Sequence, residues 1–251
     1  MKLDIKNIGN PKNPPILFLH GFMGKGSDWS KLATELSQNY YCHLIDLPGH
    51  GKSTAEVENL KDLTRLILDS LSPKKKLTII GYSMGGRIAL YMILTFPELF
   101  NKAIIESASP GIKNIKERET RYQSDLNLLS DIKSFRSFLN SWYENPLFGD
   151  LTGLKETLIE EKLENDPEKL KSALKFLSVG NQPNLWEMIK KLSVPTLYIS
   201  GDRDKKYSQI GEELTELSPM ITKKVIKNAA HITHLQNPKE FNTQVALFLS
   251  K

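Results

Sequence analysis

The chain has 251 residues, a length that suits one large α/β domain with an insertion. It contains no apolar run long enough to cross a bilayer, and Met1–Lys6 alternates like a short strand and lacks the apolar core of a signal peptide. The net charge of +5 comes from lysines scattered among acids, which argues against a nucleic-acid-binding protein. The single cysteine, Cys42, excludes an internal disulfide and predicts a reducing compartment such as the cytoplasm.

The first part of the chain alternates predicted strands with loops and helices. Ile16–Leu19 is a continuous apolar run, as expected of a central parallel strand, and it stops at the glycine-containing loop His20–Gly24. A second predicted strand, His43–Asp46, leads into the glycine-rich loop Leu47–Ser53. The end of this loop is similar to a phosphate-binding loop, but Leu47 stands where that motif requires glycine, so we predict no nucleotide site.

A strand, a sharp turn and a helix follow one another in the stretch 77–92. Leu77–Ile80 is apolar and β-branched, Gly81-x-Ser83-x-Gly85 forms the turn, and Ile88–Met92 has helical spacing. This is the context that a nucleophile elbow requires. The glycines suit a turn too tight for side chains beside Ser83, and the helix N-terminus favours negative charge that develops nearby. Ser83 is therefore the candidate catalytic nucleophile or base.

The second half interrupts this alternation with a long helical segment. After a strand at Ala103–Ser107, the alternation to that point predicts a mostly parallel, doubly wound sheet. Residues 112–192 contain no convincing strand and are too long for a loop, so we predict a helical lid inserted into a core made of 1–111 and 193–251. The helices expected in this insertion run through Glu117–Leu129, Ile132–Glu144, Lys155–Glu164 and Pro167–Leu177. The sheet resumes at Val194–Ser200 and Thr222–Ile226, and Pro238–Leu249 closes the chain as a helix.

A catalytic serine needs a base and an orienting carboxylate, which in this kind of fold follow it in the order acid, then histidine. Asp202 and Asp204 both follow the predicted strand 194–200, and the sequence pattern leaves both open. His231 follows the last strand and is preferred over His234, which could instead cap the last helix. The spacing of these two histidines lacks the glutamate of a zinc-binding helix, so we predict no metal site.

Two backbone N–H groups are predicted to form the oxyanion hole. One belongs to Met84, the residue after Ser83, and the other to Phe22 in the early glycine-containing loop.

The placement of the arginines indicates further functional residues, because only six of the 34 basic residues are arginines. A lysine-rich chain is expected to keep arginine where its planar fork is needed, and Arg87 lies in the elbow while Arg118 and Arg121 lie together in the insertion.

Nearly the whole chain resembles an α/β-hydrolase-fold protein, and in particular the 2-succinyl-6-hydroxy-2,4-cyclohexadiene-1-carboxylate (SHCHC) synthases of menaquinone and phylloquinone biosynthesis. The resemblance lies in the following stretches: His20–Gly24, Asp46–Gly51, Gly81–Arg87, Pro110–Ile112, Glu117–Arg121, Trp142–Pro146 and Gly201–Lys206. It implies a cofactor-free lyase that eliminates pyruvate from the polycarboxylate SEPHCHC to give SHCHC, with the serine of a Ser-His-Asp triad acting as base. It also favours Asp204 over Asp202 as the carboxylate of that triad.

The same resemblance implies which residues bind the substrate. Arg87 and Arg121 are expected to bind carboxylates, with Tyr82 and Trp142 lining the pocket, because arginine pairs with a carboxylate through two hydrogen bonds. Arg118 lies one helical turn from Arg121 on the same face, where it either assists Arg121 in binding the substrate or pairs with a glutamate.

One family feature is changed and one alternative function remains open. The resembling proteins carry a further lid arginine, and the corresponding stretch here is Ala173–Asn181. Either Lys175 takes its place as a substrate-binding residue, keeping the charge without the fork, or the contact is lost. The triad equally suits a serine carboxylesterase or a carbon–carbon hydrolase, in which Ser83 attacks a carbonyl. The arginines discriminate, since an esterase for neutral substrates has no use for them.

Overall fold

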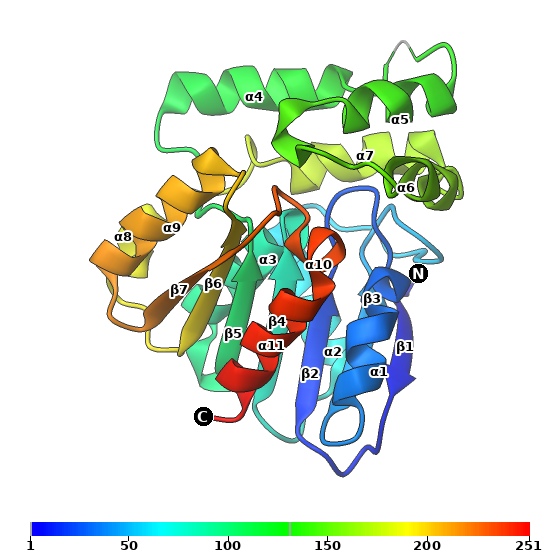
Figure 1. The fold of residues 1–251 in the computed structure, drawn as a ribbon. Helices are drawn as coiled ribbons and strands as arrows, with labels where there is room; N and C mark the ends of the chain where they lie inside the picture. The colour runs from blue at the N-terminus through cyan, green and yellow to red at the C-terminus, as the bar shows by residue number, and fades with distance from the viewer. Residues whose placement is uncertain (1, 131) are drawn as a thin grey trace.

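The computed structural model describes residues 2–130 and 132–251, which form a seven-stranded sheet flanked by helices (Figure 1). The strand order is β1-β3-β2-β4-β5-β6-β7; β1 is antiparallel to β3 and every other pair is parallel. The strands are β1 (Asp4–Ile8), β2 (Pro15–Leu19), β3 (Tyr41–Asp46), β4 (Leu77–Tyr82), β5 (Phe100–Glu106), β6 (Thr196–Gly201) and β7 (Ile221–Ile226). The α/β-hydrolase fold predicted from the sequence is confirmed.

The central strands are buried on both faces, which explains their unbroken apolar sequences. Phe18 of β2, for example, is opposite Leu44 of β3 and Ile80 of β4, and all three side chains are buried. The chain leaves β2 for β3 on one side and later enters β4 on the other side. The strand order therefore reverses at β2 and β4, and the crevice beyond the carboxyl ends of such strands is where open α/β sheets bind ligands.

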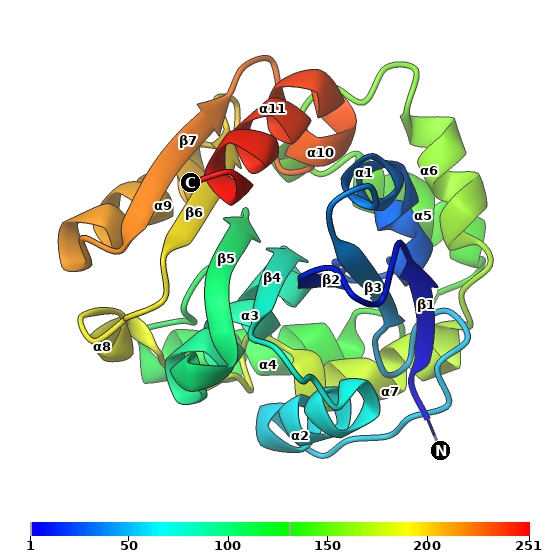
Figure 2. The same cartoon turned by 90° about the horizontal axis from the view of Figure 1, so that it is seen from below.

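Helices cover both faces of the sheet, as Figure 2 shows from below. One buried cluster joins the sheet to α2 (Leu60–Leu71), α3 (Met84–Thr95) and α9 (Lys205–Leu217). A second joins the opposite face to α1 (Ser30–Leu36) and α11 (Pro238–Leu249). The short helices near the sheet are the 3₁₀ turns η1 (Gly26–Trp29) and η2 (Pro97–Leu99) and the single turns α8 (Trp186–Ile189) and α10 (Thr233–Gln236), whereas the 3₁₀ turn η3 (Pro146–Phe148) lies in the insertion described next.

Four helices lie across the top of the sheet in Figure 1, between β5 and β6 in sequence. They are α4 (Ile115–Asn127), α5 (Phe135–Tyr143), α6 (Lys155–Lys162) and α7 (Pro167–Leu177). The last three of them share a third cluster of buried side chains, which includes Leu139, Ile159 and Leu170, whereas α4 contributes no side chain to it. The segment 112–192 is not uniform, because Trp186, Ile189 and Leu192 at its end pack into the main core instead. Ala173 and Leu177 of α7 also belong to this main core, so the insertion is joined to the sheet by shared packing.

Local sequence signals account for where the helices begin. Both α7 and α11 start with proline at their first turn, after the capping residues Asp166 and Asn237. Asn237, rather than His234, caps α11. The cap at Asn114 starts α4 at Ile115, two residues before the expected Glu117, because its side chain accepts the N–H groups of Lys116 and Glu117.

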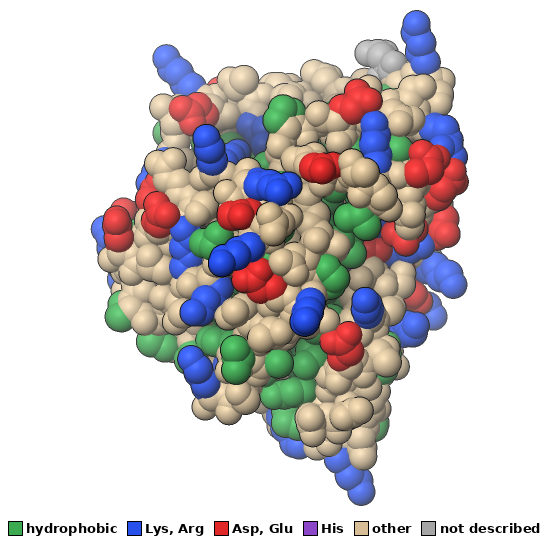
Figure 3. Space-filling view, in the orientation of Figure 1, with side chains coloured by type: hydrophobic (Ala, Val, Ile, Leu, Met, Phe, Trp, Pro, Cys, Tyr) green, Lys and Arg blue, Asp and Glu red, His purple; other side chains and the backbone are tan. Residues whose placement is uncertain are grey.

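The surface carries charges of both signs. On the face seen in Figure 3, acidic and basic side chains are interspersed, and no continuous basic stripe crosses it. None of the helices among residues 2–130 and 132–251 is long and apolar enough to span a membrane.

Candidate active site

Ser83 occupies a strained turn between β4 and α3. Its backbone has φ 49° and ψ −108°, a conformation that non-glycine residues seldom adopt and that costs on the order of 1–3 kcal/mol. The turn is tightly packed, because a Cβ at Gly81 would lie 2.5 Å from the carbonyl oxygen of Gly85. A Cβ at Gly85 would in turn lie 2.3 Å from the carbonyl oxygen of Leu19 in β2. The two glycines thus allow the turn to close and to approach the neighbouring strand.

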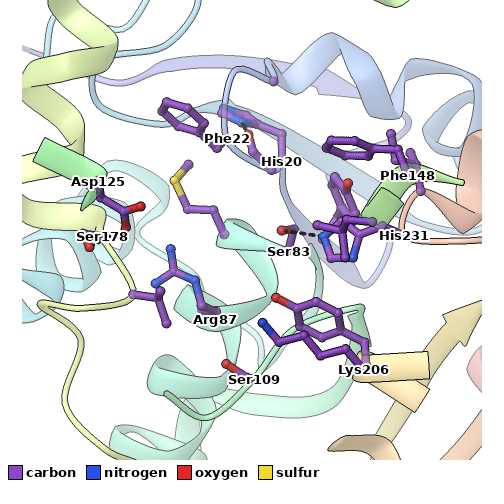
Figure 4. Close-up of a pocket in the computed structure, with 18 of the residues that line it drawn as sticks. His20, Phe22, Ser83, Arg87, Ser109, Asp125, Phe148, Ser178, Lys206 and His231 are labelled. Carbon is purple, nitrogen blue, oxygen red and sulfur yellow. Dashed lines mark hydrogen bonds between the residues drawn. The ribbon is translucent and has the colours of Figure 1, made fainter. Parts of the chain in front are cut away.

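Ser83, His231 and Asp204 are connected by hydrogen bonds (Figure 4). The Ser83 hydroxyl lies 3.0 Å from Nε2 of His231, and Nδ1 of His231 lies 2.9 Å from Oδ2 of Asp204. The histidine and the aspartate are both buried. Since the Asp204 carboxylate accepts the Nδ1–H proton, Nε2 is left free to accept the proton of the serine.

The two candidate aspartates have different surroundings. Asp204 is buried; its second oxygen accepts the backbone N–H of Tyr207 at 3.1 Å, so it also caps α9. Asp202 is exposed and accepts the backbone N–H of Ala229 at 3.2 Å. The structure therefore brings Asp204, and not Asp202, to the histidine.

A second histidine–carboxylate pair lies beside the first and was not anticipated from the sequence. The buried Glu106, at the end of β5, accepts the Thr233 hydroxyl at 2.6 Å and the His234 backbone N–H at 3.0 Å. Its other oxygen lies 2.8 Å from Nδ1 of His234. These bonds hold α10, and with it the loop that carries His231, against the sheet. The only sequence signal was an acidic residue ending an otherwise apolar strand.

The loop after β2 lies directly against the elbow. A Cβ at Gly21 would lie 3.6 Å from the Ser83 Cβ, which puts the following residue, Phe22, beside the serine. His20 fixes this loop by accepting the Leu47 N–H on Nε2 at 3.0 Å and by pairing Nδ1 with the Gly21 carbonyl at 2.8 Å. Burial is the main cause that lowers the pKa of His20, in keeping with a neutral ring. Phe22 and Met84 thus flank Ser83, where backbone N–H groups would meet an oxyanion.

A cavity of about 510 Å³ opens above Ser83, between the sheet and the four inserted helices. Aromatic side chains line one part of it, among them Tyr82, Trp142 and Phe148. The Trp142 and Phe22 rings meet edge to face with centroids 5.9 Å apart, and Tyr82 packs against His231 with centroids 5.4 Å apart. Burial raises the pKa of Tyr82 well above its usual value, so its hydroxyl stays protonated.

Cationic groups line the other part of the cavity. Arg87 is half-buried, and burial lowers its pKa to about 10, so it stays charged at neutral pH. Its guanidinium donates to Oε1 of Gln182 and to the Leu177 carbonyl, both at 2.7 Å. These acceptors are neutral, so Arg87 keeps an uncompensated positive charge at the cavity wall and also holds the end of α7.

Arg121 reaches the same cavity from α4. Its Nε donates to Oδ1 of the buried Asp125 at 2.7 Å, and Oδ2 of Asp125 accepts the Ser178 hydroxyl at 2.6 Å. The remaining two predicted cations are placed differently. Arg118 is half-buried but does not line the cavity, and Lys175 is exposed outside it. The structure thus brings Tyr82, Arg87, Arg121 and Trp142 together and leaves Arg118 and Lys175 apart.

The described residues hold no cluster of three or more histidine, cysteine or carboxylate side chains arranged to bind a metal ion. The arrangement supplies a hydroxyl hydrogen-bonded to a histidine, a place for an oxyanion, and positive charge on one wall. Such a site can remove a proton or attack a carbonyl in a substrate that carries negative charge.

A model of the α/β hydrolase fold matches residues 14–238, and the chain belongs to this family. Within the family, its sequence is 31% identical to a 2-succinyl-6-hydroxy-2,4-cyclohexadiene-1-carboxylate synthase of Yersinia pestis, covering 95% of this chain and 88% of that one. It is 30% identical to the chloroplastic protein PHYLLO of Arabidopsis thaliana over 98% of this chain and 16% of that longer protein.

Solved structures agree with the sequence comparison. The structure of MenH from S. aureus superposes with a TM-score of 0.90 and 31% identity over 99% of this chain and 98% of that one. An esterase from Thermogutta terrifontis superposes with a TM-score of 0.81 over 99% of this chain and 93% of that one, but at 19% identity it shares the fold alone. The resemblance to SHCHC synthases is therefore confirmed.

Proposed function

We propose that this protein is an SHCHC synthase, a lyase that eliminates pyruvate from SEPHCHC in menaquinone or phylloquinone biosynthesis. The observation that carries the proposal is the combination, in one cavity, of the Ser83–His231–Asp204 chain with the charged groups of Arg87 and Arg121. A polycarboxylate can pair with both cations, whereas a neutral ester leaves Arg87 without a charged partner, since only Arg121 has a carboxylate, Asp125, beside it. The relatives named SHCHC synthase support the same substrate class.

In this mechanism Ser83 acts as the base. His231 accepts the proton of the serine hydroxyl, and the serine oxygen removes a proton from carbon of the substrate. The electrons of that C–H bond move through the ring and expel the enolpyruvyl group as its C–O bond breaks, and the departing enolate takes up a proton to become pyruvate. The N–H groups of Phe22 and Met84 stabilise the oxyanion that forms on the substrate. No cofactor takes part in these steps.

The proposal includes the roles of the surrounding parts. Arg87 and Arg121 bind substrate carboxylates, Tyr82 and Trp142 shape the pocket, and α4 to α7 form a lid over it.

The proposal places the protein in the reducing cytoplasm. The single cysteine, Cys42, is buried, and burial raises its pKa to about 12, so it stays a thiol, which fits that compartment.

The decisive experiment measures pyruvate release from SEPHCHC by the purified chain, with hydrolysis of a neutral p-nitrophenyl ester measured in parallel. We expect rapid pyruvate release that Ser83→Ala abolishes, and little ester hydrolysis. A serine carboxylesterase or carbon–carbon hydrolase, which the triad also suits, gives the opposite result. Fast ester hydrolysis without pyruvate release would overturn the proposal.

Arg87 gives the same test at a single residue. Losing a charged hydrogen bond to a substrate carboxylate costs roughly 2–4 kcal/mol, so Arg87→Ala is expected to lower kcat/KM for SEPHCHC by roughly 30- to 1,000-fold. Arg87→Lys is expected to recover part of the loss, because it keeps the charge without the fork. Gln182→Ala serves as the control, since it removes a neutral partner of Arg87 and leaves the cation in place.

A further inference from the structure

Lys206 lies in the first turn of α9, two residues after Asp204, and its side chain lines the cavity above Ser83. In Figure 4 its ammonium points into the cavity on the side where Arg87 and Ser109 lie. Among the residues that the structure describes, no acceptor or carboxylate is within hydrogen-bond or ion-pair distance of this ammonium. The Tyr207 ring lies beneath it, with 5.4 Å from Nζ to the centroid.

The charges around Lys206 make this position unfavourable for a cation in the empty cavity. Burial and then the neighbouring Arg121 lower the pKa of Lys206, and the opposite effect of Asp204 is smaller. Arg121 likewise adds to the lowering of the pKa of Arg87, after burial. Three cationic side chains from α3, α4 and α9 therefore converge on one space and repel one another.

The acids that line the cavity do not relieve this repulsion, because most of them already have partners. Asp28 is paired with Lys162, Asp125 with Arg121, and Glu213 with Lys113. Asp204 is held by His231, and Glu117 lies at the exposed start of α4. None of these acids forms an ion pair with Lys206, so an anionic ligand that enters the cavity can supply its countercharge.

We propose that Lys206 is a substrate-binding residue, whose ammonium pairs with a carboxylate of the substrate beside the triad. It supplies the lysine contact that the sequence assigned to Lys175, which lies outside the cavity. A lysine offers three donors on a flexible stem and acts as a point charge, so it can follow a carboxylate that moves during the reaction. The inference rests on the proposed function for the identity of the substrate, but the carboxylate site itself can be tested without it.

The kinetic test compares Lys206→Met, Lys206→Arg and the control Lys205→Met in pyruvate release from SEPHCHC. Lys205 is the adjacent lysine; it is exposed to solvent, as Lys206 also is, but it does not line the cavity. We expect Lys206→Met to lower kcat/KM by about 10- to 100-fold, mainly through KM, because a contact made equally in the bound substrate and the transition state affects binding. Lys206→Arg restores most of the loss, and Lys205→Met stays within about twofold. Unchanged kinetics in Lys206→Met would overturn the proposal.

A second measurement separates binding from support of the triad, and from the proposed function. A neutral fluorophosphonate labels Ser83 covalently, and tricarballylate, a simple tricarboxylate, serves as the anionic probe that slows labelling. Without tricarballylate, Lys206→Met and the wild type are expected to label equally fast. With it, Lys206→Met requires about tenfold more tricarballylate for the same protection, whereas Lys205→Met behaves as the wild type does.

The outcomes are distinguishable. Slow labelling of Lys206→Met without tricarballylate would show that the lysine supports the triad instead, and equal protection of the two proteins would show that it binds no carboxylate. If the wild type releases no pyruvate from SEPHCHC, the proposed function fails, while the tricarballylate experiment still decides the role of Lys206.

Discussion

Asp204 makes two contacts at once, one with each oxygen of its carboxylate. One oxygen holds His231 and the other caps α9 through the Tyr207 N–H. The negative charge stabilises the imidazolium that forms when His231 accepts a proton from Ser83. A neutral side chain of the same shape can fill the position but cannot supply this charge.

Replacing each aspartate by asparagine tests the assignment. Asp204→Asn is expected to lower kcat for pyruvate release by about 10³- to 10⁴-fold while the protein remains folded by circular dichroism. Asp202→Asn, the matched control, keeps a side chain that can still accept the Ala229 N–H and is expected to retain activity within about threefold. The assignment is wrong if Asp202→Asn is the inactive variant.

At the scale of the elements, the four inserted helices are attached to the core unequally. Lys162 of α6 forms a buried ion pair with Asp28 of η1 at 2.8 Å, and Arg87 of α3 holds the last carbonyl of α7. The neighbouring α4 buries a single residue, Asp125, and its Ile115 is 77% exposed. Arg121 belongs to this loosely packed helix, so one of the two arginines proposed to bind the substrate lies on the part of the insertion that is least held by packing.

Hydrogen exchange tests whether α4 behaves as the moving part of a lid. We expect its amides to exchange faster than those of α6 and α7 in the free protein, because it has the smallest buried surface. Addition of the product SHCHC is expected to slow exchange in α4 more than in α6, since the ligand joins Arg121 to the core. If α4 amides are protected as strongly as the central strands, and SHCHC changes nothing, the lid interpretation is wrong.

At the scale of the whole molecule, buried histidines make the fold sensitive to acid. Burial lowers the pKa of His43 to about 4 and, as the main cause, that of His50 to about 3. In the unfolded chain these rings titrate near 6.5. Between the folded and unfolded pKa values the unfolded state binds more protons than the native state, so the free energy of unfolding falls as the pH falls.

Each such histidine is expected to remove about 1.4 kcal/mol of stability for each pH unit below 6.5, down to its folded pKa. Urea unfolding at pH 7, 6 and 5 measures this slope. His43→Gln keeps a donor for the Asn7 side chain, which lies 2.8 Å from Nδ1, but cannot titrate. Its stability is therefore expected to fall less steeply with decreasing pH than that of the wild type, by about 1.4 kcal/mol per pH unit. Parallel slopes for the two proteins would show that His43 contributes nothing to acid lability.

Features encoded by short stretches of sequence were predictable. The strand, turn and helix around Ser83 follow from the apolar run, the two glycines and the helical spacing of residues 77–92. Pro167 and Pro238 mark the starts of α7 and α11, because proline suits the first turn of a helix and few other positions in it. The chain order of serine, acid and histidine also places all three at the carboxyl ends of parallel strands.

The sequence by itself therefore determined the fold class, the elbow at Ser83 and the set of loops that meet there. The tertiary structure decided which side chains reach the site: Asp204 rather than Asp202 contacts His231, and Lys206 of α9 rather than Lys175 of α7 lines the cavity. It also revealed the pairing of Glu106 with His234, residues 128 positions apart in the chain. The physical reason is that a motif constrains the backbone of neighbouring residues, whereas the direction and burial of a side chain depend on contacts between segments that are distant in sequence.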